Sequence, residues 1–244
     1  MHRRRTGLAA VLASLMALTM THAGAAEPLK ERSSMQNEQT LSAKQQAIIP
    51  IGAFGAIGDM TRLHTALEQG LDAGLSVSDC KEILVQLYAY AGFPRSLNAL
   101  GELMKVLEAR KQRGIQDAPG AAAGPVPTGA ALLAAGTANQ TKLVGAPVAG
   151  PVFEFAPAID QYLKTHLFGD IFARDNLDWQ SRELATIGVL AALSGVEAQL
   201  QSHLRVSLNV GLSRAQLKQF VQVLATQVDA AAAQRAHTAL EKTP

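Results

Sequence analysis

One pattern occurs twice in the sequence: LHTALEQGLDAGLS at 63–76 and LQSHLRVSLNVGLS at 200–213. In both copies leucines recur at helical spacing, as on the apolar face of an amphipathic helix, and Gly-Leu-Ser follows them. Glycine supplies the left-handed residue that ends such a helix, and serine caps the next one. The serine and Gln216 complete a capping box in the second copy, and Asp79 gives the first copy a looser version. Both stretches therefore predict a helix, a glycine turn and a second helix.

The similarity extends beyond this pattern. Residues 41–58 align with 177–194 at an offset of 136, and 59–87 align with 196–224 at an offset of 137, after one inserted residue, Gly195. A repeated helical unit is the signature of a fold whose copies bury their apolar faces against each other. We therefore predict an all-α protein in which two duplicated helical repeats pack as a pseudo-dimer.

Composition divides the chain into five predicted segments. The first carries three arginines, an apolar run and an Ala-Gly-Ala cleavage motif, as a secretory signal peptide does. A polar stretch follows it, and a stretch rich in Gly, Ala and Pro separates the two helical blocks, as a linker does. The predicted segments are the signal peptide at 1–25, a flexible leader at 26–40, the first repeat at 41–113, the linker at 114–150 and the second repeat at 151–240.

Charge and cysteine content exclude several classes of protein. The formal net charge is +2, but residues 1–25 hold three arginines and no acid, which leaves 19 basic against 20 acidic residues. No basic patch remains for a nucleic-acid partner, and no later stretch is long and apolar enough to span a membrane. We expect a periplasmic or secreted protein. Its single cysteine, Cys80, excludes an intrachain disulfide, a cysteine-rich zinc site and a CxxC pair, and its apolar neighbours predict burial.

Two segments carry a family resemblance. EILVQLYAYAGFPRSLNAL at 82–100 and LDWQSRELATI at 177–187, the second followed by His203 and by NVGL at 209–212, resemble motifs of the carboxymuconolactone decarboxylase family. The alkylhydroperoxidase D-like proteins share the fold of this family. The resemblance implies an all-α, usually oligomeric fold, with trimers of tandem chains, that acts on a small-molecule substrate without a bound cofactor.

The two copies differ where they carry polar residues. Glu183 and His203 lie in the second copy, and the first copy has Ala47 and Ala66 at the aligned positions. Tyr90 belongs to the first copy only. The polar groups thus occur once each, in different halves, which predicts one composite site per chain where the halves meet.

The resemblance and this alignment select five candidate site residues. Glu183 and His203 are the expected acid–base pair, because a histidine beside a carboxylate exchanges protons near neutral pH. Arg95 is expected to hold a substrate carboxylate, Tyr90 to supply a pocket hydroxyl, and Asn98 to add a further contact. No step of a decarboxylation through such groups requires a metal. Simpler roles stay open at this point: Glu183 as a first-turn helix acid and His203 as a half-buried core residue.

These residues predict a cofactor-independent lyase or isomerase that acts on a small carboxylated or lactone substrate. The alternative is a non-catalytic small-molecule-binding or scaffold protein of the same fold. A peroxidase is the least favoured class. Alkylhydroperoxidase D-like enzymes use a C-x-x-C-x-x-x-H motif, and counting back from His203 places the two sulfur positions at Val196 and Gln199, which form no thiolate.

Overall fold

A computed structural model describes residues 40–244, and every regular element in this range is helical. The all-α prediction is therefore confirmed. The predicted signal peptide and nearly all of the predicted leader lie outside the described residues.

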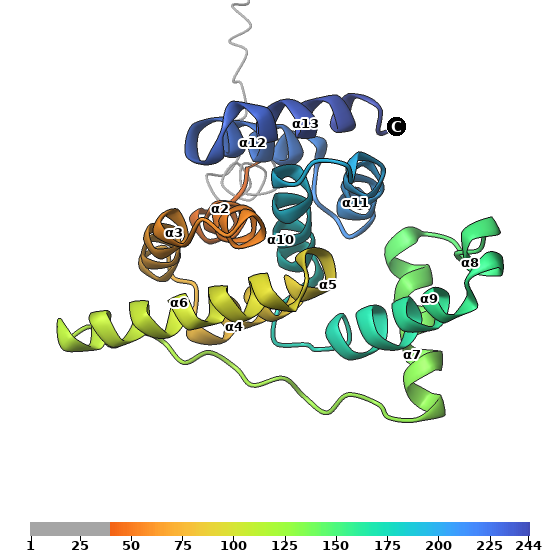
Figure 1. The fold of residues 1–244 in the computed structure, drawn as a ribbon, viewed down its shortest axis with the longest axis horizontal. Coiled ribbons are helices and arrows are strands. Elements are labelled where there is room, and N and C mark those ends of the chain that lie inside the picture. The colour runs from red at the N-terminus through yellow and green to blue at the C-terminus, as the bar shows by residue number, and fades with distance from the viewer. Residues whose placement is uncertain (1–39) are drawn as a thin grey trace, which may run out of the picture.

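The helices form two blocks and an arm between them (Figure 1). The first block consists of α2 (Ala43–Ile57), α3 (Met60–Asp72), α4 (Val77–Gln86), α5 (Tyr88–Ala91) and α6 (Phe93–Gln112). The arm consists of α7 (Ala130–Val144), α8 (Pro151–Phe155), α9 (Pro157–Tyr162) and the π-helix η1 (Leu163–Ile171). The second block consists of α10 (Trp179–Ala192), α11 (Glu197–Asn209), α12 (Arg214–Val223), the π-helix η2 (Leu224–Val228) and α13 (Ala230–Glu241).

The predicted glycine turns and serine caps are present in both blocks. Gly74 and Gly211 have φ of 93° and 100°, the left-handed region in which glycine is favoured. Ser76 and Ser213 each complete a capping box with the residue three positions on. The repeat alignment also pairs the helix starts. The same offsets relate the first residues of α2, α3, α4 and α6, in this order, to those of α10, α11, α12 and α13. The duplication remains a prediction, which this agreement supports.

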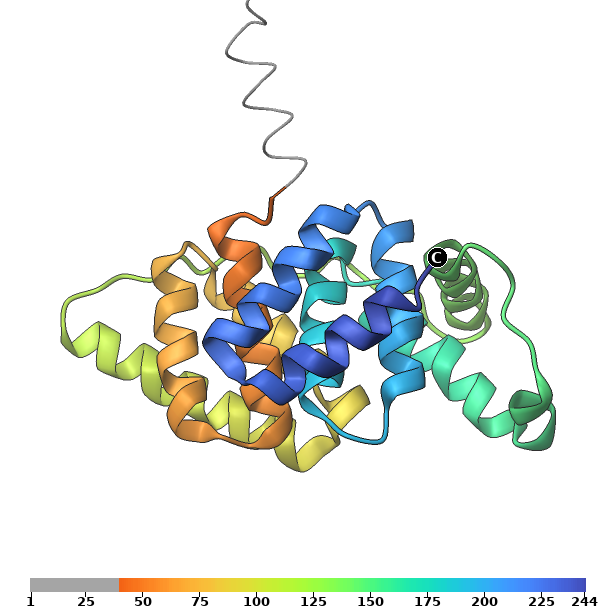
Figure 2. The same cartoon turned by 90° about the horizontal axis from the view of Figure 1, so that it is seen from above.

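Helices α2 and α10 lie side by side at the centre of the molecule, beneath α12 and α13 (Figures 1 and 2). Their contact is reciprocal: a Cβ on Gly52 would lie 2.8 Å from the carbonyl oxygen of Ala185, and a Cβ on Gly188 would lie 2.8 Å from that of Ile49. The alignment pairs Gly52 with Gly188, and Ile49 with Ala185. Two aligned glycines thus allow the two backbones to approach, as expected for an isologous contact.

This approach predicts opposite effects for two Gly→Ala substitutions. A Cβ added at Gly101 in α6 would meet nothing within 4 Å, so Gly101→Ala should stabilise the protein by about 0.5–1 kcal/mol through helix propensity. Gly52→Ala offers the same propensity gain but forces α2 away from α10, and we expect it to destabilise by roughly 1–3 kcal/mol. Urea unfolding of both variants tests this, and equal stabilisation by the two would contradict the close contact.

The segment 114–150, predicted as a linker, is only partly one. Its first part is extended, and the carbonyls of Ala118 and Pro119 accept hydrogen bonds from the first N–H groups of α4, at Val77 and Ser78. Its second part forms α7, which packs on η1. Alanine and leucine dominate α7 and favour a helix, so the linker prediction gave too little weight to intrinsic helix propensity.

The arm projects from the rest of the molecule in both views (Figures 1 and 2). It exposes several large apolar side chains, as surfaces that meet another protein often do. They are Leu133, Val152, Phe155, Ile159 and Tyr162. The homo-oligomer stays a prediction. Among residues 40–244, no helix has the length and apolar character needed to cross a membrane.

Candidate functional site

Glu183 and His203 meet in the second block. Glu183 lies on α10 and is fully buried, whereas the His203 side chain on α11 is 14% exposed. The Nδ1 atom of His203 lies 2.9 Å from Oε2 of Glu183, which is hydrogen-bond distance. The structure therefore brings the two predicted acid–base residues together, with the imidazole on the side nearer to solvent.

Burial distinguishes this pair from two other histidine–carboxylate contacts. His166 and Asp170 lie 2.7 Å apart on one helix, and their side chains are 49% and 45% exposed. His64 contacts Glu102 at 2.8 Å, and its side chain is 38% exposed. Both of these imidazoles are more exposed to water than that of His203, although the Glu102 side chain is itself only 10% exposed. Water screens an exposed contact more than a buried one.

Tyr90 brings the first block to this pair. It lies on the short helix α5, and its ring meets that of His203 edge-on, with 5.4 Å between the centroids. Its hydroxyl group is buried beside the side chain of Thr186. Oε1 of Glu183 is also buried, and it has no hydrogen-bond partner among the described residues. Burial and the nearby Glu183 carboxylate both raise the pKa of Tyr90, so the phenol stays protonated. Three of the five predicted residues thus meet, from both halves.

The other two predicted residues do not join this cluster. Arg95 and Asn98 lie in the first turns of α6 and are exposed. The Arg95 guanidinium lies against Gly58, at the end of α2. Within residues 40–244, no hydrogen bond or ion pair connects either side chain to Glu183 or His203. The alignment placed the α5–α6 corner correctly, but the orientation of α6 turns these side chains to solvent.

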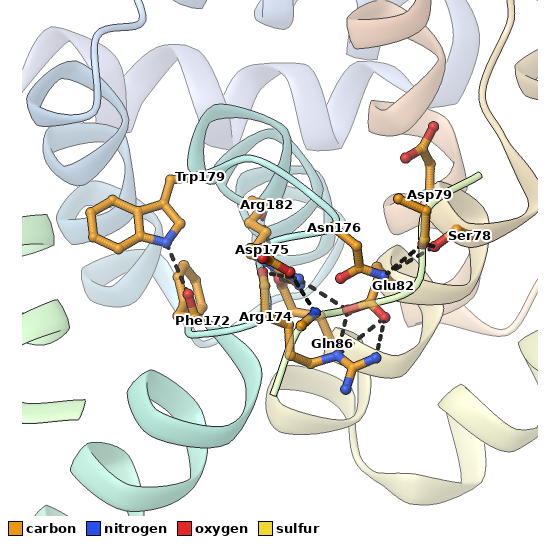
Figure 3. Close-up of polar contacts among 12 residues, drawn as sticks. Ser78, Asp79, Glu82, Gln86, Phe172, Arg174, Asp175, Asn176, Trp179 and Arg182 are labelled. Atoms are coloured by element: carbon orange, nitrogen blue, oxygen red, sulfur yellow. Dashed lines mark hydrogen bonds and ion pairs between the residues drawn. The ribbon is translucent and has the colours of Figure 1, made fainter. Parts of the chain in front are cut away.

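A buried charge network one residue from Glu183 was not predicted. Glu82 on α4 is 4% exposed and accepts three hydrogen bonds from Arg174, one of 2.7 Å from Nη2 and two of 2.9 and 3.1 Å from Nε (Figure 3). It also accepts one of 3.0 Å from Nη2 of Arg182, which is fully buried on α10. One carboxylate therefore joins the first block, the end of the arm and the second block.

Two neutral side chains extend this network. The side-chain nitrogen Nε2 of Gln86 donates hydrogen bonds to the backbone carbonyl of Arg182 at 2.9 Å and to the hydroxyl of Thr186 at 2.7 Å. Both side chains are buried. Glu82 and Arg182 each lie in one of the two family-like segments, and that shared placement was the signal available in the sequence.

The network sets the ionisation of Glu82. Burial raises its pKa, but hydrogen bonds from Arg174, Arg182 and Asn176 outweigh that effect and hold the pKa at about 2. A carboxylate whose pKa is lowered in the folded state stabilises that state while it is ionised. Glu82 thus contributes its full stabilisation above its ordinary pKa of 4.5.

We therefore expect acid to remove a defined part of the stability. As the pH falls from about 4.5 to about 2, Glu82 should lose a contribution of roughly 3 kcal/mol to the free energy of unfolding. Urea unfolding at a series of pH values measures this loss. Glu82→Gln should start less stable and show a shallower decline over the same range, and parallel declines in the two proteins would contradict the assignment.

Two hollows on the described surface lie away from the acid–base pair. One of about 580 Å³ opens between the starts of α2, α4 and α10, and its lining includes Lys44, Asp79 and Asp178. Another of about 430 Å³ lies against Trp179 and Arg174, beside the arm. Neither includes Glu183 or His203.

The only cysteine is not available for thiolate chemistry. Cys80 is fully buried, as its apolar neighbours predict. Burial, together with the nearby carboxylates of Asp79 and Asp117, raises the pKa of the thiol to about 12. Within residues 40–244, no three or more His, Cys, Asp or Glu side chains are grouped so as to hold a metal ion.

Comparison with known proteins finds a family match for the second block and the end of the arm. Residues 157–242 match the family described as Carboxymuconolactone decarboxylase family. The matched range begins with α9 and ends just after α13, so it contains Glu183 and His203 but not Tyr90. The C-terminal part of the chain is therefore similar to this family, and its helical fold is consistent with that similarity. No curated protein matches the chain.

Proposed function

We propose that the protein is an acid–base enzyme of the carboxymuconolactone decarboxylase type that acts on a small carboxylated or lactone substrate. The observation that carries this proposal is the contact between the buried carboxylate of Glu183 and the partly exposed imidazole of His203. The family domain contains both residues, which adds independent support.

The two residues have different tasks in the proposed reaction. Glu183 accepts the Nδ1–H of His203, so it fixes the tautomer and the orientation of the ring. The second ring nitrogen, Nε2, is then the atom that exchanges a proton with the substrate. Oε1 of Glu183 is the buried acceptor whose hydrogen bond a substrate hydroxyl would complete, and the Tyr90 hydroxyl is a second buried polar group at the pair.

A decarboxylation at this pair balances without another reactant. The bond between the carboxylate carbon and the substrate ring breaks, CO₂ leaves, and the electron pair enters the conjugated lactone carbonyl. His203, protonated on both nitrogens, gives the proton on Nε2 to the ring carbon and is left neutral. An isomerisation uses the same atoms, with removal and return of one proton.

The test is conversion of carboxymuconolactone by the purified protein. Release of CO₂, with loss of the substrate carboxylate signal in ¹³C NMR, is the expected result. Consumption of a peroxide in the presence of a dithiol, without release of CO₂, would contradict the proposal and favour a peroxidase.

A second candidate is a non-catalytic protein that binds a small molecule or serves as a scaffold. The position of the 580 Å³ and 430 Å³ hollows favours it, because neither includes the acid–base pair. If a carboxylated lactone raises the melting temperature but is recovered unchanged, this candidate replaces the enzyme.

A further inference from the structure

A hollow of about 210 Å³ lies in the first block, between α2, α3 and the segment after α12. Alanine, glutamine and proline make up its entire lining. The residues are Ala43, Gln46, Ala47, Pro50, Ala66, Gln69, Ala73 and Gln227.

This hollow occupies the position that the repeat alignment pairs with the acid–base site. Ala47 aligns with Glu183, Ala66 aligns with His203, and the offset of 137 that relates α4 to α12 places Gln227 opposite Tyr90. All three members of the Glu183–His203–Tyr90 cluster thus have their counterparts in the wall of one hollow. Shorter side chains at two of these positions leave open the space that the carboxylate and the imidazole fill in the second block.

The lining disfavours a charged ligand. None of its side chains ionises, so an ion bound there would lose water without gaining an opposite charge. The carboxamides of Gln69 and Gln227 each offer donors and an acceptor, and Ala47 and Ala66 provide apolar wall.

The backbone adds one further acceptor. Pro50 lies inside α2 and has no N–H, so the carbonyl of Gln46, one turn earlier, lacks its usual helical donor. Both residues line the hollow. The Gln46 carbonyl oxygen is therefore available to accept a hydrogen bond from a ligand that also contacts the apolar wall.

We propose that this hollow is a second ligand site, which binds a small uncharged molecule with an amide or hydroxyl group on an apolar body. It binds without acid–base chemistry, because the ionisable residues of the aligned site are absent. The inference goes beyond the proposed function and does not depend on turnover at Glu183 and His203.

Titration with benzamide tests the proposal, with benzoate as the charged probe of the same shape. In protein labelled at the alanine methyl groups, benzamide should shift the Ala47 and Ala66 signals in a saturable way, and benzoate should bind at least tenfold more weakly. No shift at either methyl group in millimolar benzamide, or equal binding of the two probes, would overturn the inference.

Substitutions locate the binding. Ala47→Leu fills the hollow from a half-buried position and should weaken benzamide binding at least tenfold, and Gln69→Ala should weaken it through loss of the carboxamide. Ala215→Leu adds the same bulk at an exposed position of α12 and should leave binding unchanged. Binding that survives Ala47→Leu, or shifts confined to the surroundings of His203, would also overturn it.

Discussion

Replacing His203 by alanine is expected to lower the rate of carboxymuconolactone conversion by about 10²- to 10⁴-fold, the range that a positioned acid–base group contributes. The imidazole is the partly exposed member of the pair, and in the proposed reaction its Nε2 exchanges the proton with the substrate. Its removal leaves Glu183 without a hydrogen-bond partner in the interior, so the loss of activity must be separated from loss of structure. Initial rates and circular dichroism on the same samples separate the two.

His166→Ala is the matched control. This residue is also a histidine in contact with a carboxylate, but both side chains are about half exposed, so its replacement should change the rate less than twofold. Glu183→Gln keeps the shape of the side chain and should reduce the rate while a folded spectrum is retained. An unchanged rate in folded His203→Ala would reject His203 as the catalytic acid.

Replacing Glu82 by alanine is expected to lower the free energy of unfolding by about 3–5 kcal/mol. The carboxylate is the shared acceptor of two arginines, and Arg182 has no exposed surface through which water could replace it. The variant therefore leaves a buried guanidinium without its counter-ion, which costs more than the pair itself contributes. Denaturant unfolding at neutral pH measures the loss.

Two comparisons test the cause of that loss. Glu68 pairs with Arg113 at the surface, where the arginine side chain is 52% exposed, so Glu68→Ala should cost at most about 1 kcal/mol. Glu82→Leu combined with Arg182→Met removes both charges and should recover part of the stability lost in Glu82→Ala. A loss no larger than that of Glu68→Ala would show that water or other side chains already compensate Arg182.

Local sequence signals predicted the helices of both blocks well. The glycine turns and capping boxes at Ser76 and Ser213 depend on residues within one helical turn, and the structure has them where the pattern places them. The sequence also predicted the pairing of Glu183 with His203. The two residues lie on the consecutive helices α10 and α11, within the segment that resembles a family motif.

Features set by contacts between distant segments were not predicted. The network around Glu82 depends on how α4, the end of the arm and α10 meet, and nothing within one segment encodes that contact. The position of Arg95 away from the pair was not predicted for a related reason, because the orientation of α6 against α2 decides which side chains face the solvent. In the segment 114–150, the glycines and prolines concealed an alanine-rich helix.

The arm is tied to both blocks, by a contact near its C-terminal end and by another within it. Where η1 leads into α10, Arg174 binds Glu82 of the first block, and at the end of α7 the side-chain amide of Asn209 donates to the carbonyls of Leu143 and Val144. A segment anchored in this way acts as a brace across the seam between the blocks. Any rotation of one block against the other would have to break charged or amide contacts at one of these anchors. We therefore expect the two blocks to keep their relative orientation when a ligand binds.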